Sequence, residues 1–215
     1  MKPESSVIFF PCRDIAETKE HHPKSPVHSF FLSDPNGYVL EFQKTTYLIQ
    51  LAEQKHIPQI AALYVKNWKK TYRGILSLAY LDSLDEEEIG RTWSEYIKKE
   101  GHGIFIALEG DTVLGFASFM PYHRIDNCIY LDSLHVEEMR RGEGIGTELI
   151  RRVHEEGLRA KYPQMAICVI RGNDRARELY VKLGAVFLRD KVDTFTGETS
   201  YSEIYVWDLT KGERI

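Results

Sequence analysis

The sequence has few cysteines, no long apolar run and no excess of positive charge. Its three cysteines, Cys12, Cys128 and Cys168, are far apart and without CxxC spacing, which argues against a disulfide framework or a structural zinc site. No apolar run approaches the roughly 20 residues of a membrane span, and the first residues have too short an apolar core for a signal peptide. The formal net charge is −4, so no basic field favours nucleic acid. We therefore expect a cytoplasmic protein that binds no metal, no nucleic acid and no membrane.

Two common phosphate-binding fingerprints are also missing, although residues 140–146 read RRGEGIG. Counting from Gly142, the third glycine of a GxGxxG pattern would stand at position 147, which is Thr147. No lysine follows these glycines, so the stretch is not a Walker A loop. A nucleotide-binding domain of either common kind is excluded at this position.

The 215 residues divide into a short N-terminal piece, residues 1–45, and a larger remainder, residues 46–215. In the first piece a strand, a truncated helix and a hairpin around Asp-Pro-Asn-Gly are expected at 7–12, 12–20 and 28–43. In the remainder, periodicity predicts strands at 46–52, two within 103–122, and others at 128–136, 164–170, 186–190 and 200–209, with helices at 57–72, 84–100, 144–162 and 173–185. This order predicts an α/β fold with a mixed sheet.

The stretch from Arg141 to Gly146 follows a predicted strand and opens a predicted helix. The first N–H groups of a helix have no intrahelical partner and lie at the positive end of its dipole. Glycines let phosphates come close to those groups. The stretch is thus either a phosphate cradle, in which Glu143 has to point away from the ligand, or a tight turn with arginines for solubility.

Two segments carry a resemblance to a known family. LHVEEMRRGEGIGTELIRRV, residues 134–153, resembles the acyl-CoA-binding motif Arg/Gln-x-x-Gly-x-Gly/Ala of the GNAT N-acetyltransferases. Residues 172–187 are similar to that family's Asn-x-x-Ala-x-x-x-Tyr-x-x-x-Gly-Phe segment, with a small shift before the final Phe187. Residues 67–84 resemble a bacterial subgroup with a Trp-x-x-Thr-Tyr helix. The resemblance covers about residues 47–209 and implies a mixed, mostly antiparallel sheet flanked by helices, with a small β-rich appendage before it.

The resemblance implies direct acetyl transfer from acetyl-CoA, as a co-substrate, to a primary amine. It implies that the loop after Arg141 binds the pyrophosphate, and that two parallel strands separate so that the first can pair with the pantetheine arm. The implied cofactor-binding residues are Ser133, Leu134, His135, Val136, Arg141, Gly142, Glu143, Gly144, Ile145, Gly146, Thr147 and Asn173.

The same resemblance implies that Tyr180 protonates the departing thiolate, although a core aromatic residue is the alternative. The position of the family's usual glutamate base is Tyr130 in this sequence. Asp132 shares that strand face by the period of two, and it either takes the proton or only binds substrate. His123 and His135 are weaker candidates for the base.

Trp68, Tyr72 and Arg73, together with Tyr130, are candidates for the acceptor side, with ordinary packing as the alternative. The acceptor itself, a small-molecule or peptide amine, cannot be chosen from the sequence.

The N-terminal piece resembles the beginning and the end of a glyoxalase/bleomycin-resistance (vicinal oxygen chelate) domain whose middle is absent. The resemblance implies that Glu41 occupies a metal-ligand position, to which His21, His22 and His28 could add nitrogens. Much of the metal cavity would be missing, so we expect a remnant that packs on the larger domain or forms a homodimer contact. Two other functions remain open: a catalytically idle acyl-CoA sensor, and a metal-dependent glyoxalase-like protein.

Overall fold

The computed structural model describes residues 27–33, 39–45, 47–195 and 198–211, and the chain divides into two compact units, Met1–Thr46 and Tyr47–Ile215. In the first unit, β1 (Val27–Ser33) and β2 (Val39–Thr45) pair antiparallel, which confirms the predicted hairpin. The strand predicted at 7–12 and the helix predicted at 12–20 lie outside the described residues.

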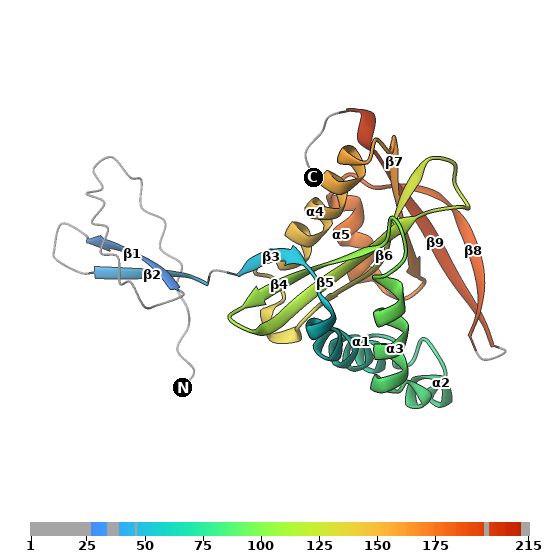
Figure 1. The fold of residues 1–215 in the computed structure, drawn as a ribbon, viewed down its shortest axis with the longest axis horizontal. Coiled ribbons are helices and arrows are strands. Elements are labelled where there is room, and N and C mark those ends of the chain that lie inside the picture. The colour runs from blue at the N-terminus through green and yellow to red at the C-terminus, as the bar shows by residue number, and fades with distance from the viewer. Residues whose placement is uncertain (1–26, 34–38, 46, 196–197, 212–215) are drawn as a thin grey trace. The chain divides into compact units, whose positions relative to one another are not determined.

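The second unit is built on a seven-stranded sheet with the strand order β3-β4-β5-β6-β7-β9-β8 (Figure 1). Only β6 and β7 run parallel, so the mostly antiparallel sheet is confirmed. A parallel pair needs a long crossover connection, and the helix between β6 and β7 supplies it. The strands are β3 (Leu48–Leu51), β4 (Gly103–Glu109), β5 (Thr112–Pro121), β6 (Cys128–Val136), β7 (Gln164–Ile170), β8 (Val186–Phe195) and β9 (Glu198–Asp208).

Five α-helices are described: α1 (Ile57–Thr71), α2 (Leu78–Ser83), α3 (Glu86–Tyr96), α4 (Ile145–Arg159) and α5 (Asp174–Lys182). Three short 3-10 turns lie at Gln54–His56, Glu138–Arg140 and Leu209–Lys211. No helix in the described part of the chain is long and apolar enough to cross a membrane.

Two features differ from the sequence prediction. The helix α2 was not predicted because six residues are too few for a helical period to show; its N-cap Ser77 accepts a hydrogen bond from the Tyr80 backbone at 3.3 Å. The strand β8 runs to Phe195, beyond the predicted end at residue 190, because it pairs with β9 along its length.

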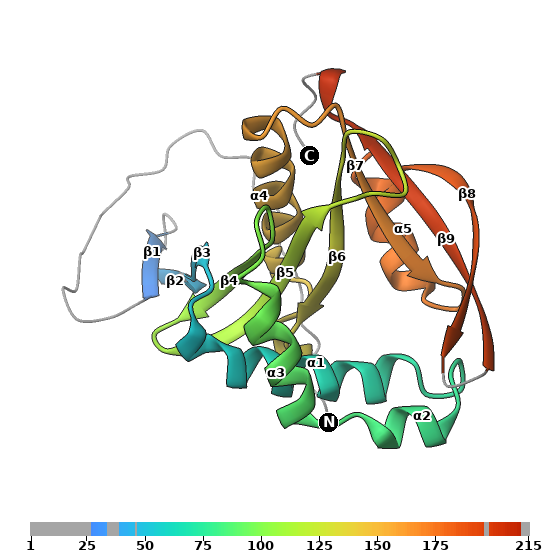
Figure 2. The same ribbon diagram turned by 45° about the vertical axis from the view of Figure 1, so that its right-hand side comes forward.

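The alternation of side chains along β4 and β5 divides the core between the two faces of the sheet. Phe105 and Ala117 pack with α4 and α5 on one face, whereas Ile106 and Phe116 pack with α1 and α3 on the other. Figure 2 shows these two groups of helices on opposite sides of the sheet. Each fully buried Ile, Leu or Phe contributes roughly 1.5–3 kcal/mol to folding, so both layers hold the sheet rigidly.

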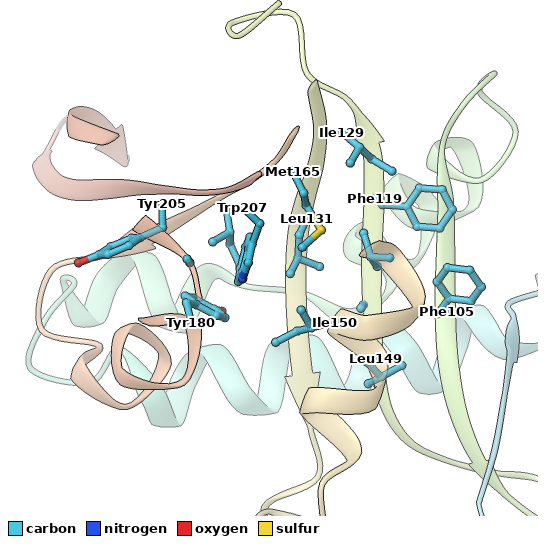
Figure 3. Close-up of a cluster of buried hydrophobic side chains, with 14 of the residues drawn as sticks. Phe105, Phe119, Ile129, Leu131, Leu149, Ile150, Met165, Tyr180, Tyr205 and Trp207 are labelled. Carbon is cyan, nitrogen blue, oxygen red and sulfur yellow. The ribbon is translucent and has the colours of Figure 1, made fainter. Parts of the chain in front are cut away.

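The core also fixes α5. Tyr180 is 5% exposed and its ring meets Trp207 edge-on at a centroid distance of 5.9 Å (Figure 3). The Trp207 Nε1 donates a hydrogen bond to the Leu183 carbonyl at 2.8 Å, directly after the last turn of α5. The helix α5 is thus held by a buried ring and a partly buried hydrogen bond.

Two irregularities in β6 shape the site. The register with β5 passes from Ser118–Ser133 to Phe119–Leu131, which leaves Asp132 as the extra residue of a β-bulge. Bulges re-aim side chains and are common beside active sites. The pairing with β7 ends at Leu131–Ile167, although both strands continue. The ends of the two parallel strands therefore separate.

Candidate active site

Two cavities lie beside this separation. The loop cavity, of about 490 Å³, lies among the end of β6, residues 140–147 and α5. The aromatic cavity, of about 440 Å³, lies between helices α1 to α3 and strands β6 to β9. Six residues line both cavities: Tyr72, Leu134, His135, Asn173, Ala176 and Tyr180. The two cavities are therefore adjacent and share one wall.

The loop cavity ends at the open N-terminus of α4. Gly142 and Gly144 have φ angles of 92° and 85°, a region that L side chains rarely adopt. Gly144 is the N-cap and brings no side chain, and the first helical bond runs from the Glu148 N–H to the Gly144 carbonyl at 3.0 Å. The N–H groups of residues 145–147 thus have no intrahelical partner. All three residues line the loop cavity, which gives it the geometry of an anion site.

Arg140 holds Glu143 away from this site. Its Nε donates to both Glu143 oxygens at 3.0 and 2.9 Å, and its terminal nitrogens contact Glu109 at 2.9 and 3.3 Å. Arg140 is only 17% exposed in its side chain. Glu143 is therefore engaged in an ion pair and does not line either cavity, unlike the cofactor-binding residues predicted around it.

Arg141 fastens the loop to the sheet. Its Nε donates to the Val136 carbonyl at 3.3 Å and its terminal nitrogen donates to Asn67 Oδ1 at 3.2 Å. Asn67, on α1, donates to the same Val136 carbonyl at 3.2 Å. Asn67 is buried and was not predicted; a polar side chain on the buried face of a helix was the available signal.

Two basic residues of α5 were also missed. Arg175 and Lys182 line the loop cavity, and in the described part of the chain neither forms an ion pair with a carboxylate. Their cationic groups are free to meet an anionic ligand. Nothing in the sequence distinguishes them from the other charged residues of that helix.

The aromatic cavity owes its name to a row of rings on the helices. Trp68 lies 5.3 Å from Tyr64, 4.6 Å from Tyr72 and 6.1 Å from Tyr80, measured between ring centroids. Tyr64 continues the row to Trp93 at 5.8 Å. These rings give an apolar wall that can hold the hydrocarbon part of a ligand.

Asp132 lines the aromatic cavity at the bulge. Burial raises its pKa, while the Ser118 hydroxyl, which donates to Oδ2 at 3.5 Å, and the positive charges of His102 and Lys191 oppose that shift. A carboxylate of raised pKa is a stronger proton acceptor near neutral pH. Tyr130, at the family's glutamate position, lines the same cavity and stacks on Tyr122 at 4.4 Å.

Tyr180 lies at the junction of the two cavities. Burial, together with the nearby Tyr72 and Cys168, raises its pKa, so the phenol keeps its proton at neutral pH. Asn173 caps α5, where its Oδ1 accepts from the Ala176 N–H at 3.4 Å, and its amide nitrogen contacts the Tyr72 hydroxyl at 3.4 Å.

The two histidines considered as proton acceptors, His135 and His123, differ in burial and in position. Burial, with the nearby Arg141 charge, lowers the pKa of His135 to about 3, and its ring packs against Tyr64 and Phe116 at 5.1 and 5.0 Å. His135 is therefore neutral and a weak base. His123 is exposed and lines neither cavity.

Arg73, predicted at the acceptor side, is likewise exposed and outside both cavities. All other predicted site residues, Glu143 excepted, line one cavity or both.

Strands β7, β8 and β9 add polar groups that the sequence did not reveal. Lys191 Nζ and Asp193 Oδ1 form an ion pair at 2.6 Å, and both residues line the aromatic cavity with Cys168 and Ser202. Burial raises the pKa of the Cys168 thiol, so it is protonated at neutral pH. Within the described residues, no group of three His, Cys, Asp or Glu side chains could hold a metal ion.

With this geometry established, comparison with known proteins is direct. The model of the acetyltransferase (GNAT) family matches residues 57–185, more than half of the chain. The chain belongs to this family. The match includes the loop cavity's glycines, α5 and all three helices that carry the rings, α1, α2 and α3.

Individual relatives agree with this assignment. The chain is 31% identical over 130 residues to the uncharacterized N-acetyltransferase YuaI of Bacillus subtilis, which covers 58% of this chain and 72% of the relative. It is 40% identical over 57 residues to the thialysine N-epsilon-acetyltransferase of Bos taurus, covering 26% of this chain and 34% of that protein. The solved PaiA N-acetyltransferase of Thermoplasma acidophilum, in complex with coenzyme A, shares the fold with a TM-score of 0.60 at 20% identity, covering 74% of this chain and 98% of that one.

Proposed function

We propose that the protein transfers an acetyl group from acetyl-CoA to a primary amine by direct attack in a ternary complex. The observation that carries this proposal is the pair of cavities joined by Leu134 and Tyr180 where β6 and β7 separate. One cavity has the properties of an anion site and the other those of a site for an organic amine.

The loop cavity fits the donor. The uncapped N–H groups at the start of α4 suit a pyrophosphate, and Arg175 with Lys182 supplies positive charge for further phosphates. Beyond Leu131 the edge of β6 has no partner in β7, so its backbone groups can pair with the amides of the pantetheine arm. The coenzyme A complex of the solved PaiA relative supports this assignment.

The aromatic cavity fits the acceptor, and Asp132 is placed to take a proton from the amine, directly or through water. The neutral amine nitrogen then attacks the thioester carbonyl carbon, a C–N bond forms, and the nitrogen of the adduct releases its extra proton to solvent. A backbone N–H near Leu134 stabilises the oxyanion. When the C–S bond breaks, Tyr180 gives its proton to the leaving sulfur, which suits its raised pKa.

The acceptor class is a small-molecule or peptide amine. A relative named for thialysine favours a small molecule. An idle sensor on the same fold is not favoured, because a carboxylate lines the aromatic cavity and a phenol lines both cavities.

For the N-terminal piece, residues 1–45, a truncated glyoxalase-like domain stays a prediction, as does a homodimer formed through it. The family match begins at residue 57 and does not reach this piece. His21 and His22 lie outside the described residues, as do the side chains of Glu41 and His28.

Thiol release from acetyl-CoA over a panel of primary amines, with the acetylated product identified by mass, tests the proposal. Tyr180→Phe should lower kcat roughly 100-fold and leave acetyl-CoA affinity unchanged. Tyr205→Phe is the matched control, because Tyr205 belongs to the same core and lines neither cavity. Equal losses in the two variants, or no acetylated product with any amine, would refute the assignment.

A further inference from the structure

Tyr96, the last residue of α3, brings a hydroxyl group without a partner to the wall of the aromatic cavity. Its ring meets Trp93 and His102 edge-on, at centroid distances of 5.0 and 4.8 Å. The residue is only 8% exposed, and within the described residues its hydroxyl makes no hydrogen bond of good geometry. A buried hydroxyl without a partner is uncommon in folded proteins, and a polar group of a ligand would satisfy it.

The Tyr96 hydroxyl lies beside two polar groups at the bulge of β6. Ser118 shares a face of β5 with Phe116 by the period of two, and Phe116 packs with α1 and α3. Ser118 is fully buried, and its hydroxyl donates to Asp132 Oδ2 at 3.5 Å. The Tyr96 phenol is close enough to interact with both Ser118 and Asp132. Two hydroxyls and one carboxylate therefore meet beside the rings of α1 and α3.

The hydrogens of these groups can be assigned in one consistent direction. A hydroxyl donates one hydrogen and has two acceptor lone pairs, and burial, which raises the pKa of Tyr96, keeps its phenol protonated. Because the Ser118 hydrogen goes to Asp132, the Ser118 oxygen can accept the Tyr96 hydrogen. The Tyr96 oxygen and the second oxygen of Asp132 then remain as acceptors for a donor in the cavity. A protonated primary amine, with its three N–H groups, fits two such neighbouring acceptors.

We propose that Tyr96 binds the reacting nitrogen of the acceptor, so that the amine donates one N–H to the Tyr96 oxygen while Asp132 takes the proton that has to be removed. The neutral amine keeps its lone pair for the thioester carbonyl, and the hydrogen bond to Tyr96 limits how the nitrogen can turn. Tyr96 itself neither gains nor loses a proton. This inference rests on the proposed function, and the covalent step is the one described there.

The position of Tyr96 favours the reacting nitrogen over any other polar group of the acceptor. Asp132, the proposed proton acceptor, lies beside the Tyr96 hydroxyl, so a nitrogen that contacts one is within reach of the other. Removal of the hydroxyl should therefore affect every amine alike, whatever the rest of the molecule. It should not destabilise the free protein, because this hydroxyl contributes no hydrogen bond of good geometry to the fold.

Tyr96→Phe, which removes only the hydroxyl, tests this role, and Tyr122→Phe is the matched control. Tyr122 is also 8% exposed but lines neither cavity. Butylamine, L-lysine and 2-phenylethylamine serve as probes together with any other amine that the wild-type protein acetylates, because they share a primary amine and differ in the rest of the molecule. Tyr96→Phe should lower kcat/KM by the same factor, roughly 10- to 100-fold, for every amine that is a substrate. Its acetyl-CoA affinity by calorimetry should be unchanged and its Tm no lower than that of wild type, and Tyr122→Phe should keep the wild-type kcat/KM.

The inference is overturned if Tyr96→Phe keeps the wild-type kcat/KM, or if it lowers kcat/KM for one amine and spares another. It is also overturned if the Tm falls together with the rate, since the hydroxyl would then support the fold. These results would leave the proposed function intact, because the wild-type protein would still acetylate amines. If the wild-type protein binds acetyl-CoA and acetylates no amine, the proposed function fails and the role of Tyr96 fails with it.

Discussion

The loop cavity and the aromatic cavity are neighbours of similar size with different construction. Most of the loop cavity comes from two short segments, residues 134–147 and 173–182, and its anion site consists of backbone N–H groups at a helix start. The aromatic cavity draws side chains from four helices and four strands spread over residues 64–202. The first depends on local chain geometry, whereas the second depends on the tertiary fold.

This difference predicts different responses to mutation. A donor site made of backbone tolerates most side-chain changes and fails where a glycine is replaced. An acceptor site made of side chains keeps donor binding when it is altered and changes rate or specificity instead. The two sites can therefore be damaged separately, and Tyr180 and Leu134 lie where the effects meet.

The largest effect is expected at Asp132. Asp132→Asn should lower kcat by about 10²–10⁴-fold through loss of the proton acceptor, with acetyl-CoA affinity unchanged. In wild-type protein the base works only when ionised, so kcat should fall as pH drops through its pKa, which burial raises above the usual carboxyl value. A pH profile of kcat should show this acidic decline, and the variant should lack it. If the variant keeps the full rate, Asp132 only binds substrate.

The next effect tests the backbone cradle. Gly144→Leu should weaken acetyl-CoA binding roughly 10- to 100-fold, the value expected for losing hydrogen bonds to a charged group. Gly110→Leu is the matched control, because Gly110 also has a positive φ, of 58°, with open space around it, in the β4–β5 turn. Calorimetric titration with acetyl-CoA measures both. Unchanged affinity in Gly144→Leu would place the pyrophosphate elsewhere.

A smaller effect is expected from the exposed cations of α5. The double variant Arg175→Gln/Lys182→Gln should weaken acetyl-CoA binding roughly 3- to 10-fold at low salt and less at high salt, since exposed charges contribute up to about 1 kcal/mol each. Arg177→Gln, on the same helix but outside the cavity, should have no effect. A loss that does not depend on salt would indicate a structural cause.

A further prediction concerns stability rather than turnover. Between pH 6.5 and about 3 the unfolded chain protonates His135 and the folded chain does not, because its folded pKa is lowered to about 3. Stability should therefore fall as pH drops below 6.5, by up to about 1.4 kcal/mol per pH unit from this group. Urea unfolding of His135→Gln should show a shallower decline than wild type or His123→Gln. Equal slopes would mean that His135 becomes protonated in the folded protein.

The contrast between local chain geometry and tertiary fold also explains which features could be predicted from the sequence. The helix starts, the mixed sheet and the glycine turn that opens α4 depend on local periodicity and turn chemistry, and these predictions are confirmed. The parallel β6–β7 pair was implied by the family resemblance and is also confirmed. Asp132 was found through the period of two along its strand, although the bulge that makes it an unpaired residue gives no signal in the sequence.

The rest depends on contacts between distant segments. Asn67, Lys191 and Ser202 reach the site because α1 and the β8–β9 hairpin pack around it, and their polar character alone does not separate them from surface residues. Glu143 points away from the loop cavity in an ion pair with Arg140, as a phosphate cradle requires. Arg73 differs, because it follows Tyr72 in the sequence but is exposed and lines neither cavity.

Initial-rate kinetics with both substrates varied test the central claim most directly. If donor and acceptor occupy the two joined cavities together, double-reciprocal plots should intersect, and no acetylated protein should accumulate when acetyl-CoA is added alone. Parallel lines, with an acetyl group found by mass spectrometry on Cys168 in the aromatic cavity, would show transfer through a covalent intermediate. That result would contradict direct attack in a ternary complex.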